Sequence, residues 1–238
     1  MITFRLERHG VLRSVAPSPS PAARRVHLPG RARSQRAGCS RPPQLSPGIL
    51  SSVPPASFAE DYMSQWSLWV LNNGLPPIPS AVEVGESVPV AYWAGPAVGA
   101  VLHRTWAWTD DHDDDVVSDN IQCFRRGPDG WVEAGAQGGS SGGTDGRLTR
   151  LHTEPTVAYI TGEFTAEQDG WVCCCIDGCV GIGVEQVEVH DSGGVVRRTL
   201  DSPLGLFVAA SGDRVGAVVV LADHEGNEVL RTSFGLGG

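Results

Sequence analysis

Short runs of β-branched and aromatic residues recur along this chain from Trp66 to Phe234, and each run is bounded by Gly, Pro, Asp or Asn. Helical periodicity is hard to find between them. Many short strands with close turn signals are typical of a sandwich or a barrel. We therefore expect an all-β fold, a β-sandwich-like or partly closed barrel of short antiparallel strands. The expected strands are residues 66–71, 87–93, 101–109, 120–125, 130–133, 156–164, 171–176, 184–190, 195–200, 205–210, 215–222 and 228–234.

The composition changes at Met63. Residues 1–62 carry nine arginines against three carboxylates, whereas residues 63–238 carry nine arginines against twenty-four carboxylates and all seven tryptophans. A segment with few apolar residues cannot bury enough surface to offset the entropy lost on ordering it. The sequence predicts a disordered Arg/Pro/Ser-rich leader over 1–62 and one folded body over 63–238.

The leader has three interpretations. The chain contains no lysine, which indicates a GC-rich genome, and Met63 is the only methionine after Met1. The first interpretation is therefore a true start at Met63, with an upstream extension that has no function. The Arg-rich, acid-poor composition also matches an organellar transit peptide. The third interpretation is a basic arm for nucleic acid, made of Arg24, Arg25, Arg31, Arg33 and Arg36.

The acidic body limits the partners that we expect. Negative charge opposes binding to nucleic acid phosphates and to anionic lipid surfaces. The sequence also lacks a continuous apolar stretch long enough for a signal peptide or a membrane span. We expect a cytoplasmic protein that binds another protein or a small ligand, without a nucleic acid partner.

A segment rich in glycine and serine interrupts the body at Gly135–Gly146. Such a segment has little preference for a fixed conformation of its own. We interpret it as a mobile loop or as a linker. As a linker it would divide the body into all-β halves over 63–134 and 147–238.

The last third of the chain carries a pattern of glycine and valine. It reads Gly178-x-Val180-Gly181-x-x-Val184-x-x-Val187-x-Val189, followed by Asp191 and Gly193-Gly194. This pattern resembles the central strand-turn-strand of β-rich modules in actinobacterial proteins. The modules have no assigned activity, so the resemblance implies a β fold and transfers no catalytic residue.

An acidic run offers one candidate metal site. Asp111, Asp113, Asp115 and Asp119 fall at positions 1, 3, 5 and 9 of a calcium-binding loop, whose ligands are oxygens. Position 6 holds Val116 where such a loop needs glycine, and position 12 holds Gln122 where it needs glutamate. The alternatives are a non-standard calcium or magnesium site and a solvated acidic loop whose charges repel.

Cysteines form a second cluster in the sequence WVCCCIDGC, at Cys173, Cys174, Cys175 and Cys179. On a strand, Cys173 and Cys175 point to one face and Cys174 to the other. Only Cys175 and Cys179 have zinc-ligand spacing, so a zinc site with Cys173, Cys175 and Cys179 would need Cys123 or His190 to complete it. Core packing and a disulfide are the other two interpretations.

Trp106 and Trp108 should share one face of a strand, in line with Leu102 and Arg104. An exposed pair would form a stacking platform for a partner or a ligand, whereas a buried pair would belong to the core. The chain shows no nucleophile elbow, zinc-protease or phosphate-loop motif. The sequence therefore favours a non-enzymatic binding or structural module, with a metal-binding protein and then an enzyme of unknown substrate as alternatives.

Overall fold

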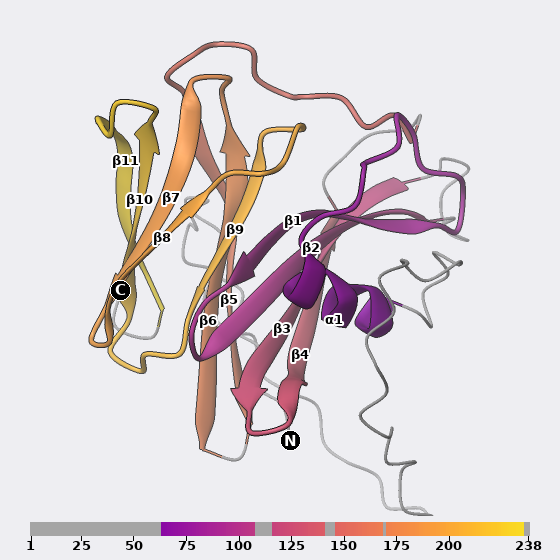
Figure 1. The fold of residues 1–238 in the computed structure, drawn as a ribbon. Coiled ribbons are helices and arrows are strands. Elements are labelled where there is room, and N and C mark those ends of the chain that lie inside the picture. The colour runs from indigo at the N-terminus through magenta and orange to yellow at the C-terminus, as the bar shows by residue number, and fades with distance from the viewer. Residues whose placement is uncertain (1–62, 108–115, 141–145, 169, 236–238) are drawn as a thin grey trace, which may run out of the picture. The chain divides into compact units, whose positions relative to one another are not determined.

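The computed structural model describes residues 63–107, 116–140, 146–168 and 170–235. These residues form eleven strands, in three antiparallel sheets, and one helix (Figure 1). The predicted all-β, sandwich-like fold is confirmed. Within the described residues, none of the three sheets closes on itself. The structure therefore favours the sandwich over the barrel. The predicted leader lies outside the described residues.

The strand order defines the three sheets. Sheet 1 has the order β1-β2-β3-β4, with β1 (Ser87–Ala94), β2 (Val98–Ala107), β3 (Val116–Gly127) and β4 (Gly130–Ser140). Sheet 2 has the order β5-β6-β9, with β5 (Ala158–Gln168), β6 (Trp171–Val180) and β9 (Leu206–Ser211). Sheet 3 has the order β11-β10-β7-β8, with β7 (Val184–Asp191), β8 (Gly194–Thr199), β10 (Ala217–Asp223) and β11 (Glu228–Phe234).

Sheet 2 is the middle layer between sheet 1 and sheet 3 (Figure 1). Its central strand β6 is buried on both faces: Cys175 contacts Cys123 of sheet 1, and Cys174 lies beside Gly235, just after the last strand of sheet 3. Strands that are covered on both sides carry near-continuous apolar runs instead of alternating ones. One hydrophobic core therefore includes residues of all three sheets.

Gly178 shows how closely the middle layer is packed. A Cβ atom at this position would lie 2.0 Å from the backbone oxygen of Tyr159 and 2.6 Å from the ring of Phe207. Only glycine fits between these two neighbours, because no real Cβ atom approaches a backbone oxygen so closely.

Residues 66–71 form part of a helix, so the prediction of a strand there was wrong. The helix α1 (Met63–Asn73) buries one face against sheet 1, where Trp66 and Val70 pack on Val101, Phe124 and Trp131. Its buried residues are Met63, Trp66, Ser67, Val70 and Leu71, which follow the spacing of an amphipathic helix.

The helix ends just before Gly74, because glycine readily adopts the left-handed backbone conformation. The N–H of Gly74, at φ 86°, donates to the carbonyl of Val70 at 2.8 Å, which is the usual glycine stop of a helix. In the ranges that the structure covers, no helix has the length and apolar character needed to cross a membrane.

Half of the segment interpreted as a loop or linker belongs to a strand. Residues 135–140 extend β4 and pair with residues 118–123 of β3, so cross-strand hydrogen bonds supply the order that glycine and serine lack alone. Residues 141–145 lie outside the described ranges. The two halves expected on either side share one core, since Trp93 and Phe207 belong to the same cluster.

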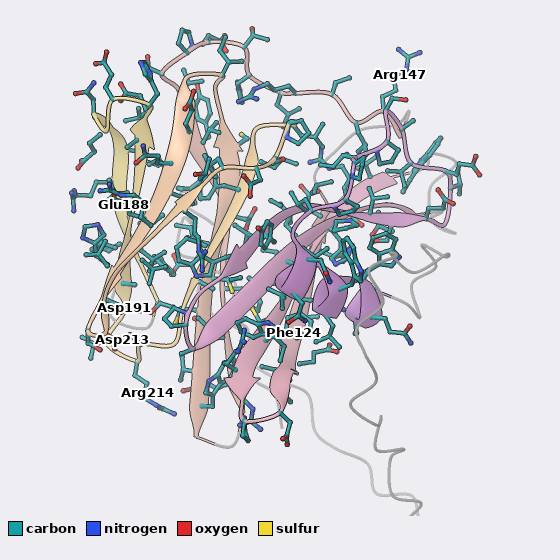
Figure 2. The ribbon with its side chains drawn as sticks, in the orientation of Figure 1. Phe124, Arg147, Glu188, Asp191, Asp213 and Arg214 are labelled. Carbon is teal, nitrogen blue, oxygen red and sulfur yellow. The ribbon has the colours of Figure 1, made fainter. Side chains whose placement is uncertain are left out.

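The strand expected at 184–190 is β7, and its inner face is buried. Val187 and Val189 are 2% and 1% exposed. On the outer face Glu188 accepts hydrogen bonds from His190 and from Arg197 of β8, and the hydrogen bond from His190 holds the pKa of Glu188 below its usual range (Figure 2). On this outer face, Glu188 is thus held by polar neighbours from its own strand and from β8.

A chain of hydrogen bonds joins α1 to sheet 1. His103 Nε2 lies 2.6 Å from Ser67 Oγ, Ser67 Oγ donates to Gln122 Oε1 at 2.6 Å, and Gln122 Nε2 donates to Ser64 Oγ. Because Ser67 donates its proton to Gln122, His103 must donate to Ser67 through Nε2. Its Nδ1 atom is then a buried acceptor that has no partner among the described residues. Burial without a partner for a second proton lowers the pKa of His103 to about 3.

We predict that His103 makes the fold sensitive to acid. Its folded-state pKa of about 3 is below the ordinary 6.5, so the unfolded chain binds the extra proton and stability falls as the pH drops from 6.5 toward 3. Between pH 7 and pH 4.5 the loss should be about 3 kcal/mol. His103→Gln cannot take up this proton, so its urea midpoint should fall less over the same interval.

The matched control is His224→Gln, at an exposed histidine in a turn. This variant should keep the wild-type dependence of the urea midpoint on pH. An equal dependence in His103→Gln and wild type would contradict the prediction.

Candidate functional sites

Asp119 is the one member of the predicted calcium loop that the structure describes. Its two carboxylate oxygens accept hydrogen bonds from Nε and a terminal nitrogen of Arg104, at 2.9 and 3.0 Å. Both Asp119 oxygens, which would bind the cation in the predicted calcium site, are thus bound by the Arg104 guanidinium. Asp111, Asp113 and Asp115 lie outside the described residues, so their part of the prediction stays a prediction.

Trp106 does not form an open platform. It is half-buried against the core, on the same face of β2 as Leu102 and Arg104, which are 1% and 6% exposed. Gly146 approaches the Trp106 ring so closely that a Cβ atom there would lie 2.3 Å from it. The structure supports core packing for Trp106, and Trp108 lies outside the described residues.

A polar cluster is buried between sheet 1 and sheet 2. Its members are the Arg104–Asp119 ion pair and Asp177 of β6, whose Oδ2 accepts from Thr161 Oγ1 at 2.5 Å. Burial raises the pKa of Asp177 to about 6, with the neighbouring Asp119 adding to the effect. A carboxyl group with a raised pKa is a common feature of acid–base sites, and this one is only 8% exposed.

Three thiols meet between β3 and β6, and we call them the thiol cluster: Cys123, Cys173 and Cys175. Their sulfur atoms all lie within 4.8 Å of one another, and Cys123 Sγ is 2.7 Å and Cys173 Sγ 3.6 Å from Cys175 Sγ. All three side chains are fully buried. Burial raises the pKa of Cys123 and Cys175 well above the ordinary thiol value, whereas hydrogen bonds from these two thiols lower the pKa of Cys173.

The structure brings Cys173 and Cys175 together as predicted, but it replaces Cys179 with Cys123. Cys179 lies four residues beyond Cys175 on the same strand, a distance of about 13 Å along an extended chain. It is buried near Arg104 instead. His190, the other residue considered as a completing ligand, bonds to Glu188 on the outer face of sheet 3.

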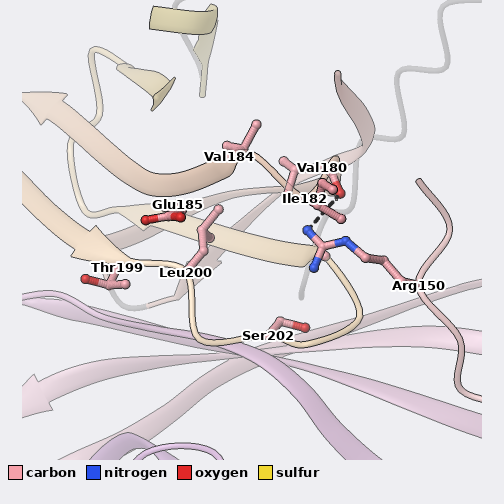
Figure 3. Close-up of a pocket in the computed structure, with 9 residues that line it drawn as sticks. Arg150, Val180, Ile182, Val184, Glu185, Thr199, Leu200 and Ser202 are labelled. Carbon is pink, nitrogen blue, oxygen red and sulfur yellow. Dashed lines mark hydrogen bonds between the residues drawn. The ribbon is translucent and has the colours of Figure 1, made fainter. Parts of the chain in front are cut away.

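One pocket lies at the turn from β6 to β7 and has a volume of about 250 Å³ (Figure 3). Arg150 reaches into it and donates to the carbonyl oxygens of Val180 and Gly181, which the figure shows for Val180. The guanidinium therefore braces the turn. The pocket is also smaller than most small-molecule sites, which run from roughly 300 Å³ upward.

A second pocket, of about 400 Å³, lies where the end of α1 meets β1, β3, β4 and β8, and we call it the arginine pocket. Two arginines, Arg126 and Arg198, and two aromatic residues, Tyr92 and Trp131, are among the residues that line it. Burial, followed by the charge of Asp201, raises the pKa of Tyr92, so its hydroxyl keeps its proton at neutral pH. The complete lining is Leu71, Asn72, Asn73, Gly74, Tyr92, Ala94, Gly95, Arg126, Trp131 and Arg198.

Sequence reasoning missed the arginine pocket because its residues come from five separate segments. No local spacing connects Asn72 with Arg198. A weak signal did exist at Arg126 and Trp131, which flank the Gly127–Gly130 turn and therefore lie opposite each other in the hairpin.

We predict that Asp177→Asn stabilises the fold above pH 6. The folded-state pKa of about 6 exceeds the ordinary 3.8, so the folded chain keeps the proton and stability is lost as the pH rises from about 4 to about 6. The loss corresponds to about 3 kcal/mol. Asparagine stays neutral and can still accept from Thr161, so at pH 7.5 the urea midpoint should rise.

The exposed Asp129→Asn, in the β3–β4 turn, is the matched control and should leave the pH dependence unchanged. An Asp177→Asn protein less stable than wild type at pH 7.5 would show that the charged carboxylate is needed.

Comparison with known proteins adds no relative to this geometry. No family model, no curated protein and no solved structure matches the chain.

Proposed function

We propose that the chain is a non-catalytic binding module that holds a small organic anion, bearing a carboxylate or a phosphate, in the arginine pocket. The observation that carries the proposal is the pair of guanidinium groups, Arg126 and Arg198, that line one pocket. Neither forms an ion pair with a carboxylate among the described residues. An anionic ligand would supply the missing partner.

Both arginines are held in place without losing their capacity to bind. Arg126 Cζ lies 4.7 Å from the centroid of the Trp131 ring, which orients the guanidinium by a cation–π contact. Arg198 donates from one terminal nitrogen to the carbonyl of Ala94. A guanidinium has five N–H donors in a planar fork, so donors remain for a carboxylate or a phosphate.

Further polar groups at the pocket favour an organic ligand over a bare inorganic ion. Asn72 and Asn73 line the pocket. Their amide nitrogens donate back to the carbonyls of Leu68 and Trp69, which leaves their Oδ1 atoms as acceptors. The pocket thus offers acceptors beside the donors of the two guanidinium groups.

The charge of the whole protein makes this pocket distinctive. The formal net charge is −9 at pH 7. A field of this sign slows the approach of anions, so an anion that binds must gain from close contacts with the two guanidinium groups. The affinity should therefore decline as salt screens those contacts.

The test is titration calorimetry of the full chain with two anions, adenosine monophosphate and benzoate. Adenosine and benzamide are the matched neutral probes. We expect at least one anion to bind and its neutral counterpart to bind more weakly. Arg126→Gln and Arg198→Gln should each lower the affinity about tenfold or more, since a hydrogen bond to a charged group contributes about 1.5–3 kcal/mol.

Arg214→Gln is the control variant, because Arg214 is an exposed arginine paired with Glu167 on another part of the surface (Figure 2). It should bind the anion as wild type does. Equal binding by all three variants, or no binding by any probe, would refute the proposal.

A further inference from the structure

The thiol cluster joins two layers of the fold. Cys123 belongs to β3 in sheet 1, and Cys173 and Cys175 belong to β6 in sheet 2. The Sγ atoms of Cys123 and Cys175 are 2.7 Å apart, although the two residues are 52 positions apart in the sequence. The sulfurs of a disulfide lie about 2.05 Å apart, so a bond between these two needs only a small movement.

The surroundings of the cluster favour a neutral product. The cluster belongs to the buried apolar core, and Ala166 is the cross-strand partner of Cys173. A metal ion bound by three thiolates would leave a net charge in this apolar region, because each bound cysteine must lose its proton. Burying an unpaired charge costs far more than burying a neutral, apolar group. A disulfide carries no charge.

We propose that the thiol cluster is an oxidation site, at which Cys123 and Cys175 form a disulfide between sheet 1 and sheet 2 and Cys173 serves as the exchange thiol. The oxidant is a small disulfide such as oxidised glutathione. One cysteine thiolate attacks it and releases one glutathione thiol. The second cysteine then attacks the mixed disulfide and releases the other. Two electrons pass to the small disulfide, and the two protons leave with the glutathione.

The position of Cys173 explains its role as the exchange thiol. Its Sγ lies 3.6 Å from Cys175 Sγ, and it also hydrogen-bonds with Cys123. Cys173 and Cys175 are two residues apart on one strand, with Cα atoms separated by nearly 7 Å, which is the upper limit for a disulfide. Cys173 can therefore form a disulfide with Cys123 more readily than with Cys175.

Full burial determines when the bond forms. An oxidant cannot reach sulfur atoms that have no exposed surface, so the reaction takes place while β3 and β6 come together during folding or when they open. The folded, reduced protein should accordingly oxidise no faster than β3 and β6 separate.

The experiment refolds the reduced chain with and without oxidised glutathione. A Cys39→Ser chain is used, so that only the five cysteines of the body remain. Thiols are then labelled in denaturant and counted by mass. We expect five labels after refolding without oxidant and three after refolding with it. The oxidised form should show a higher denaturant midpoint, which returns to the reduced value with dithiothreitol.

Three variants identify the bond, and circular dichroism first confirms that each one folds. Cys123→Ala should take up four labels under oxidising conditions, because no disulfide forms. Cys173→Ala should take up two labels, since the Cys123–Cys175 bond remains, but should oxidise more slowly. Cys179→Ala, outside the cluster, should take up two labels at the wild-type rate.

Two results would overturn the proposal. Five labels after oxidative refolding would show that the cluster is inert core packing. Stoichiometric zinc or copper in the purified reduced protein, lost in Cys123→Ala, would show a metal site instead.

Discussion

The burial of β6 on both faces is the constraint on which the rest of the structure depends. A strand covered on one side only would alternate polar and apolar residues, but every residue of β6 after Trp171 is buried. Short side chains make this possible: the run Cys173-Cys174-Cys175 fills the space between layers with small apolar groups, and Gly178 permits the contact with Tyr159 and Phe207. Sheets 1 and 3 can then pack on opposite sides of one thin layer. Both outer sheets pack against this strand and its neighbour β9.

The sequence predicted a strand well where apolar side chains recur every second residue. It predicted poorly where helix packing or cross-strand hydrogen bonds determine the structure. The strand expected at 184–190 is β7, in which Val187 and Val189, two residues apart, are both buried. The helix α1 was missed because an aromatic, apolar run of six residues fits a strand as well as a helix. The buried positions Met63, Trp66 and Val70, spaced by three and four residues, carried the helical signal. The glycines of β4 were misread because local propensity contains no information about hydrogen bonds with β3.

The candidate sites were predictable only in part, for a related reason. The pairing of Cys173 with Cys175 follows from their spacing on one strand, and the structure brings them together. Their third partner, Cys123, comes from a different sheet, so its position depends on how two layers stack. The arginine pocket depends on packing still more, because α1 must lie across sheet 1 before Asn72 can approach Arg126. Sequence patterns describe neighbours within an element, and these sites are built between elements.

Burial also explains why the interior of this fold holds neutral or paired groups, whereas the proposed site for a charged ligand lies at the surface. In the interior, the charge of titrating groups is suppressed or paired: His103 stays neutral at physiological pH, Asp177 keeps its proton up to about pH 6, and Arg104 pairs with Asp119. The proposed disulfide is a covalent change that adds no charge to such an interior. Charged ligands therefore belong at the surface, where guanidinium groups keep their water and their freedom to pair. The arginine pocket lies at the end of α1, where the layered core stops and solvent begins.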